Sequence, residues 1–340
     1  MFRRLTLLVC ICSVAFSQDG YRDIPDVVTK VATSAANWLK LETGTRAIAM
    51  SGAHTASGRG VSSLAYNPAA ITFMPDNKNQ EVYFSKSNYL VDMSHNVLGY
   101  GRKLTRADYL GLHLFYLDSG EMDITTAEYP DGGQGTFSVQ QLCFRISYGR
   151  IITKRLRIGA TFKIIREDIH TSYMQSYAFD IGSNFDTGIL TDSNGENAII
   201  LGMSVSNFGP EVRFEGPGLD QVVDTDVSVD GQLRKITEDF SLPLMFRLGV
   251  YKNMLSMGRH NLLVSVDMIN SMDYTTYMAA GMEYSLGDFA YLRAGTHLLH
   301  DTARFSCGAG LKYGGFVFDY ALSNFSVLEN THQFAIGYEF

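Results

Sequence analysis

The sequence predicts an all-β protein, a closed antiparallel transmembrane β-barrel of about 14 strands. Three observations predict this fold: an N-terminal export signal, a series of long alternating segments from residue 79 onward, and a last strand that ends on an aromatic residue. Alternation alone leaves a soluble β-sandwich open, because its strands also have one apolar and one polar face. The lengths of the segments and of their connections favour the barrel.

Residues 1–17 have the pattern of a secretory signal peptide. Two arginines precede an apolar run over residues 5–16, and a small-x-small cleavage site occupies residues 15–17. The apolar run is too short to cross a bilayer as a helix. We expect cleavage to leave Gln18 first and the exported protein to reach the bacterial outer membrane.

The composition fits a membrane barrel and disfavours other classes. No later stretch has the 18 or more consecutive apolar residues of a membrane helix, and the 19 Tyr and 21 Phe residues suit aromatic girdles. A net charge of −7 disfavours nucleic acid as a partner. After loss of the signal peptide only Cys143 and Cys307 remain, which is not a disulfide framework.

Two segments without strand character precede the alternating region. Residues 26–41 place apolar side chains at steps of three and four, which predicts a helix. Residues 43–75 are rich in glycine, alanine and serine and do not alternate, which predicts a compact segment. The predicted division is a signal peptide at 1–17, an N-terminal part at 18–78 and a barrel at 79–340.

The alternating region contains fourteen candidate strands. Most are longer than the usual strands of soluble sheets and long enough to cross a bilayer when tilted. An even number is what bacterial barrels require. The candidates lie near 81–89, 93–104, 107–118, 135–150, 154–168, 174–186, 197–208, 239–253, 259–270, 275–286, 288–298, 303–313, 315–323 and 331–340.

The last candidate strand is the most regular. Phe334, Ile336, Tyr338 and Phe340 alternate with small or polar residues, so they form one apolar face. A chain end is normally frayed and polar, whereas this one ends on an aromatic ring. We expect these four side chains to face lipid and to serve as the signal that the barrel-insertion machinery reads.

The connection lengths give the barrel an orientation. The two longest connections, 119–134 and 209–238, both follow odd-numbered strands, whereas most connections after even-numbered strands have two to five residues. With both termini in the periplasm, the long loops lie outside the cell and the short turns inside, as is typical of outer-membrane barrels. The polar connection at 187–196 is the exception.

Motifs of catalysis and of metal binding are missing from the sequence. It has neither a phosphate-binding loop nor a nucleophile elbow, and its histidines lack metal-ligand spacing. We therefore expect no enzyme activity, no cofactor and no metal site. The lumen-facing charges are of both signs, which predicts cross-pairing in a plugged interior rather than a selective ion pore: Arg145, Arg157, Lys163, Arg247, Arg304 and Lys312 against Asp267, Glu283, Asp319 and Glu339.

Two blocks of sequence carry a family resemblance. The first covers 33–71 and contains Gly-Thr-Arg-Ala-Ile-Ala-Met-Ser-Gly-Ala at 44–53 and Asn-Pro-Ala at 67–69. The second contains Asn-Phe-Gly-Pro at 207–210, Leu-Pro at 242–243 and Phe-Arg-Leu-Gly at 246–249. In order and spacing they are similar to the PorV/PorQ family of outer-membrane barrels, related to the FadL hydrocarbon transporters. Ser51 and Ala70 depart from the family's glycines.

The resemblance implies a fourteen-stranded barrel whose N-terminal segment folds into the lumen as a helical hatch, or plug. The hatch motif would be Asn67, Pro68 and Ala69. An asparagine before proline starts a turn or caps a short helix, and small residues let backbone pack inside a lumen. The alternative is that Asn67 and Pro68 only cap a helix and bind nothing.

Three functions are compatible with the resemblance. The first is a secretion-associated barrel of the type IX kind, which binds exported proteins at the cell surface through the loops at 119–134 and 209–238. The second is a FadL-like transporter of small hydrophobic molecules, with an apolar pocket gated by residues 43–75. The third is a structural barrel. The expected partners are secreted cargo or secretion-system proteins for the first function and hydrophobic small molecules for the second. Outer-membrane lipid is a partner in every case.

Overall fold

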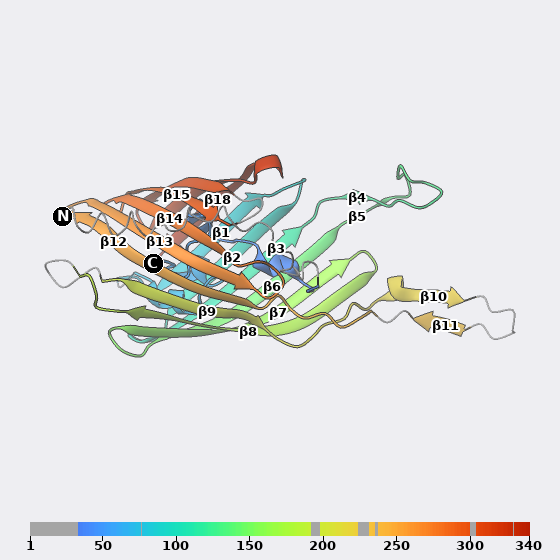
Figure 1. Cartoon of the computed structure of the whole chain (residues 1–340), viewed down its shortest axis with the longest axis horizontal. Helices are drawn as coiled ribbons and strands as arrows, with labels where there is room; N and C mark the ends of the chain where they lie inside the picture. The colour runs from blue at the N-terminus through green and yellow to red at the C-terminus, as the bar shows by residue number, and fades with distance from the viewer. Residues whose placement is uncertain are drawn as a thin grey trace, which may run out of the picture.

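Fourteen antiparallel strands of the described chain form a closed barrel, as Figure 1 shows. The computed structural model describes residues 33–340 except 76, 192–197, 224–230, 235–236, 300–303 and 329. Consecutive barrel strands pair with each other, and β1 closes the barrel by pairing with β18 from Glu81 opposite Glu339 to Asn88 opposite His332. The expected fold class is confirmed. No helix among the described residues is long and apolar enough to cross a membrane.

The barrel strands lie close to the predicted segments. Their bounds are β1 Gln80–Asn88, β2 Ser94–Lys103, β3 Asp108–Asp118, β6 Val139–Ile151, β7 Leu156–Ile169, β8 Ser172–Asp186, β9 Ile200–Phe208, β12 Met245–Met257, β13 His260–Ser271, β14 Tyr277–Leu286, β15 Ala290–Leu298, β16 Phe305–Tyr313, β17 Phe316–Asn324 and β18 Asn330–Glu339.

Two small hairpins and two short 3₁₀ helices lie in the connections. The hairpins are β4 Met122–Asp123 with β5 Thr136–Phe137, and β10 Asp220–Val223 with β11 Gly231–Arg234; the 3₁₀ helices are η4 Pro217–Leu219 and η5 Ser326–Leu328. Both hairpins project from one end of the barrel, at the right of Figure 1, and the C-terminus lies toward the other end. We call the first the loop end and the second the turn end.

Period-two alternation separates two faces along each strand. In β7, Lys163 and Ile165 are buried, whereas the exposed Ile158, Phe162 and Ile164 point to the outside. The outer surface is therefore apolar, as a wall in contact with lipid requires. The four residues of the predicted insertion signal, three in β18 and Phe340 directly after it, are all exposed, between 39% for Tyr338 and 58% for Phe334.

Two predicted elements were wrong in their bounds. The helix predicted over 26–41 falls partly outside the described residues, and within them only the 3₁₀ helix η1 Asn37–Lys40 forms. The preceding residues pair instead with the long loop, because the Ala35 amide donates to the Ser241 carbonyl at 3.0 Å. The strand predicted over 239–253 begins at Met245, since Pro243 has no N–H for a ladder.

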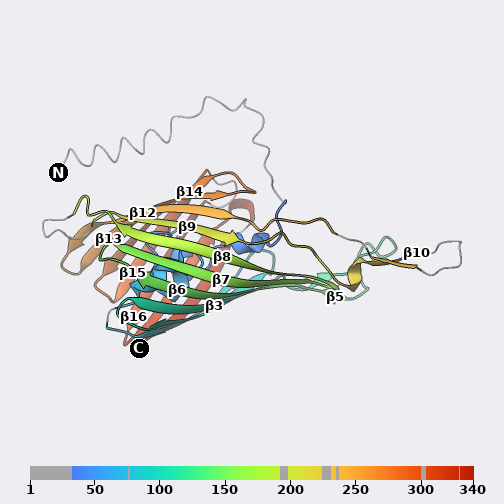
Figure 2. The same cartoon turned by 90° about the horizontal axis from the view of Figure 1, so that it is seen from below.

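Residues 33–75 run through the barrel and are called the luminal segment. It contains η1, the helix α2 Thr45–Ala49, and the 3₁₀ helices η2 Val61–Ser63 and η3 Pro68–Phe73. Trp38 contacts Phe115 and Glu167 near the loop end, and Arg157, near the turn end, donates to the Thr72 carbonyl. The segment therefore enters at the loop end, crosses the lumen and leaves at the turn end, where β1 begins (Figure 2).

Glycines on the inner face of the barrel make room for the luminal segment. A Cβ atom added at any of eleven strand glycines would come within 3.1 Å of an atom of this segment. Several lie opposite one another in adjacent strands, such as Gly149, Gly159 and Gly182. We call them the glycine ring: Gly99, Gly101, Gly111, Gly149, Gly159, Gly182, Gly202, Gly249, Gly281, Gly295 and Gly308.

Gly159→Ala tests this packing. The added Cβ would lie 2.4 Å from the Pro68 carbonyl carbon and 2.5 Å from the Ala69 nitrogen, which are backbone atoms that cannot rotate away. We expect a loss of about 1–3 kcal/mol in unfolding free energy, the usual cost of overpacking. Urea unfolding of the purified protein measures it. Gly337→Ala is the control, because its Cβ would lie no closer than 3.4 Å to any atom; equal stability of both variants would contradict the prediction.

Candidate functional site

The predicted hatch motif lies in the lumen against the glycine ring. Asn67 is the N-cap of η3, and its side-chain oxygen accepts a hydrogen bond from the Ala69 amide at 3.0 Å. Pro68 occupies the first helical position, where its fixed φ and missing N–H suit a helix start. All three residues of the motif are buried. Any role of the motif beyond capping stays a prediction.

The Asn67 side chain also ties the luminal segment to the barrel wall. Its amide nitrogen donates to the Thr55 carbonyl at 2.8 Å and to the Asn184 side chain at 2.7 Å. Asn184 in β8 in turn donates to the Ala56 carbonyl at 2.9 Å. A fully buried amide would be costly without such partners. The motif is thus joined to a loop of the luminal segment and to one strand of the wall.

A second attachment is a buried carboxylate in β13. Asp267 is fully buried, and one of its oxygens accepts hydrogen bonds from the amides of His54 and Thr55 at 2.8 and 2.7 Å. Charge-assisted bonds to backbone amides are stronger than neutral ones. The carboxylate therefore fixes the chain where the luminal segment bends between α2 and η2.

A third attachment is a network of ion pairs. Arg46 of α2 binds Glu283 of β14 through two nitrogens, at 2.7 and 2.9 Å. Glu283 also accepts from Arg293 of β15 at 2.6 Å, and Arg293 pairs with Asp319 of β17. Because Arg46 also donates to the Ser57 carbonyl at 2.8 Å, the network joins three strands to the luminal segment.

The charged lumen agrees only in part with the sequence prediction. Lys312 pairs with Glu339 at 2.7 Å. Lys163 pairs with Asp180, a residue that was missing from the predicted set of lumen-facing charges. Arg157 and Arg247 instead lie over the rings of Phe73 and Tyr66 in the luminal segment. Arg293 was also missed, although it alternates with outward-facing residues of β15 and could have been found that way.

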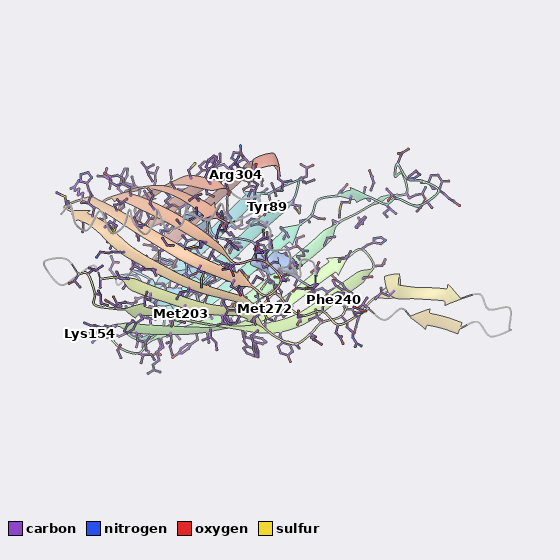
Figure 3. All side chains as sticks on the ribbon, viewed as in Figure 1. Tyr89, Lys154, Met203, Phe240, Met272 and Arg304 are labelled. Atoms are coloured by element: carbon purple, nitrogen blue, oxygen red, sulfur yellow. The ribbon has the colours of Figure 1, made fainter. Side chains whose placement is uncertain are left out.

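Above the luminal segment, toward the loop end, lies a cavity of about 480 Å³. This volume is typical of sites for small molecules. The lining comes from strand ends at the loop end, from loops and from residues 37–48, and its exposed area is mainly apolar. Its aromatic and aliphatic members are Leu41, Ile48, Tyr89, Leu90, Met245, Tyr274, Tyr277, Phe325 and Leu328, and its polar or charged members are Asn37, Lys40, Glu42, Ser87, His95, Ser271, His297, Ser323 and Thr331. Figure 3 labels Tyr89 on the barrel.

The polar groups of the cavity are largely paired. Lys40 binds Asp273 at 2.8 Å, and His297 contacts Glu42 at 3.0 Å. Burial by itself would raise the pKa of Asp273, but hydrogen bonds from Lys40 and Ser271 outweigh it and hold the pKa below its usual value. His95 lies between the rings of Tyr89 and Phe115. The exposed lining is mainly made of ring faces and aliphatic groups, and both ring nitrogens of His95 are buried without a hydrogen-bond partner among the described residues.

The described residues show no arrangement for metal chemistry. No group of three or more His, Cys, Asp or Glu side chains among them could hold a metal ion. Cys143 is buried in the lumen and Cys307 is exposed on the outer wall, so the two thiols belong to opposite faces. The arrangement supports enclosure of a small apolar molecule above a well-anchored segment.

Similar folds occur among outer-membrane channels. The chain is similar to CymD, a monoaromatic hydrocarbon channel, with a TM-score of 0.58 and 12% identity over 88% of this chain and 97% of that one. It is also similar to the toluene transporter TodX of Pseudomonas putida, with a TM-score of 0.57 and 14% identity over 87% of this chain and 97% of that one. A FadL homologue of Pseudomonas aeruginosa has a TM-score of 0.54 and 12% identity over 88% of this chain and 99% of that one.

These likenesses establish a FadL-like barrel fold. No protein-family model matches the sequence, and no curated protein sequence matches it. The resemblance to the PorV/PorQ family is therefore not supported by the comparisons, whereas the broader likeness to FadL relatives is.

Glu283→Gln tests the ion-pair network. The change leaves the Arg46 and Arg293 guanidinium groups without a full negative charge between them, and breaking a buried pair costs about 3–5 kcal/mol. We expect the luminal segment to loosen, so that ionic conductance through the protein in a planar bilayer rises. Asp168→Asn is the control, since its pair with Arg166 is exposed on the outside and contributes at most about 1 kcal/mol. Equal conductance of both variants would refute the role of the network.

Proposed function

We propose that the protein is an outer-membrane channel for small hydrophobic molecules, with the luminal segment as its hatch. The cavity above the hatch carries this proposal, because an apolar space at the loop end can receive a molecule from outside while the hatch blocks the way below it. With the long loops outside the cell, the turn end faces the periplasm. The apolar outer wall supports the outer-membrane location.

The lining supports aromatic or aliphatic molecules as cargo. Rings from Tyr89, Tyr277 and Phe325 border the cavity, and aromatic pairs gain from stacked or edge-to-face contact. On its border Lys40 forms an ion pair with Asp273, and Glu42 contacts His297, so an ionic cargo would have to compete with these contacts. The proposal coincides with what CymD and TodX are described as carrying.

Two parts of the hatch are anchored differently. Residues 43–74 are held by the glycine ring, Asn67, Asp267 and Glu283, whereas residues 37–42 are held mainly by side-chain contacts such as Lys40 with Asp273. A cargo molecule in the cavity touches the second part directly. We infer that cargo passes the hatch after residues 37–42 have shifted.

Filling the cavity tests the channel function. Ser87 is a small residue of the lining, and Ser87→Phe would occupy part of the cavity. We expect intact cells that express the protein to take up labelled toluene faster than cells with empty vector. The variant should lower the protein-dependent rate about tenfold, because the added ring takes space that the cargo needs and a loss of about 1.4 kcal/mol in cargo binding is tenfold in affinity.

Ser256→Phe, at the exposed turn end of β12, is the matched control and should keep the full rate. The shift in gel mobility on heating checks that both variants are folded. Uptake no faster than with empty vector, or full uptake with Ser87→Phe, would refute the channel.

The projecting loops favour binding of exported proteins as a second function. The hairpins β4–β5 and β10–β11 extend beyond the barrel at the loop end, where loops carry most binding sites (Figure 1). Removal of residues 217–236 would take away only the tip of the longer loop and spare the Val212–Phe240 bridge below it. If this function holds, secreted proteins that share a C-terminal domain co-purify with the protein and are lost with the deletion.

A further inference from the structure

The outer wall has a groove of about 570 Å³ that the channel function does not use. It lies over β6, β7, β8, β9, β12 and β13. Its floor is made of small outward-facing side chains, Ala160 and Ser183, and the exposed Tyr148, Met203 and Phe246 stand around them. A smooth barrel wall offers a lipid tail contact on one side only, whereas a groove offers contact on several sides.

The groove crosses the wall obliquely. One row of paired residues runs from Arg150 of β6 through Ile158, Ser183 and Met203 to Leu248 and Met268. Arg150 lies next to the turn end of its strand, whereas Met268 lies near the loop end of β13. The groove thus extends obliquely from the turn end toward the middle of the wall, so that one end of it lies near the membrane surface and the rest lies within the apolar wall.

Basic side chains border the groove at the turn end. Arg150 belongs to the groove itself, and the turn that follows β6 presents the exposed Lys154 and Arg155, of which Figure 3 labels Lys154. Two carboxylates lie on the same rim. Asp108 is 3.5 Å from Arg150, and Asp186 accepts a hydrogen bond from the Gly188 amide. The basic groups outnumber the acidic ones there.

The opposite end of the barrel has the opposite charge. The loop between β3 and β6 contains Glu121, Asp123, Glu128 and Asp131 and no lysine or arginine. An anionic headgroup is therefore attracted to the turn end and repelled from the loop end. Near a membrane surface each basic side chain strengthens the binding of anionic lipid by about 1 kcal/mol, which is about fivefold.

We propose that this groove binds an anionic phospholipid, with one acyl chain over Ala160 and Ser183 and the phosphate beside Arg150, Lys154 and Arg155. The proposal rests on the membrane location of the barrel but not on its transport function. A protein that binds lipid here and fails to carry toluene would refute the channel and leave the groove intact.

Native mass spectrometry of the full-length protein in a mild nonionic detergent tests the proposal. The probes are phosphatidylglycerol and phosphatidylcholine with identical acyl chains, offered in equal amounts. We expect phosphatidylglycerol to be retained in preference. The triple variant Arg150→Gln, Lys154→Gln, Arg155→Gln should weaken its retention by about fivefold for each charge removed.

Ala160→Leu tests the acyl-chain part by filling the floor of the groove, and it should lower the retention of both lipids. Ala309→Leu on the outer face of β16 and Arg259→Gln in the turn after β12 are matched controls that should retain lipid as the unmodified protein does. Equal retention of the two lipids, or equal loss with Ala160→Leu and Ala309→Leu, would overturn the proposal. Displacement by excess inorganic phosphate would also overturn it, because it would reveal a simple anion site.

Discussion

The close approach of the luminal backbone to the glycine ring is the constraint on which the rest of the structure depends. At Gly159 and Gly182 the backbone of Pro68 and the side chain of Asn67 occupy the space that ordinary side chains would fill. A barrel of fourteen strands lined by large side chains would have no room for the luminal segment, residues 33–75. Because the ring is made of glycine, luminal backbone packs directly on the wall at Gly159, Gly202 and Gly295, luminal side chains fill the space at other positions, and the buried polar groups reach the partners that they need.

The polar attachments follow from that packing. A chain that crosses a lumen in short helices leaves many amides and carbonyls without helical partners. Asp267 accepts a hydrogen bond from the His54 amide, and Asn184 donates to the Ala56 carbonyl. Ser204 of β9 donates to the Tyr66 carbonyl at 2.7 Å. The wall thus encloses the luminal segment and also forms hydrogen bonds with its backbone. The cavity lies beside residues 37–42, outside the part of the segment that these hydrogen bonds hold.

The sequence predicted the features that depend on alternation within a single strand. It did not predict the contacts between residues that are far apart in the chain. Alternation placed Ile164 outside and Lys163 inside correctly, because each strand needs only its own pattern. The pairing of Arg46 with Glu283 could not be read in this way, since it depends on the depth at which residue 46 crosses the barrel. The cavity lining comes from many separate segments. Part of the helix predicted over 26–41 is replaced by a pairing of Ser34 with Ser241, which lies far away in the chain and cannot be foreseen from local sequence.

The path of the luminal segment links the hatch to the closing seam of the barrel. The chain enters the barrel at one end and leaves it at the other, and the seam that encloses it joins β1 to β18, the most distant pair of strands in the sequence. Pairing of β18 with β1 completes the wall around the segment, so the strand that closes the barrel also encloses the hatch.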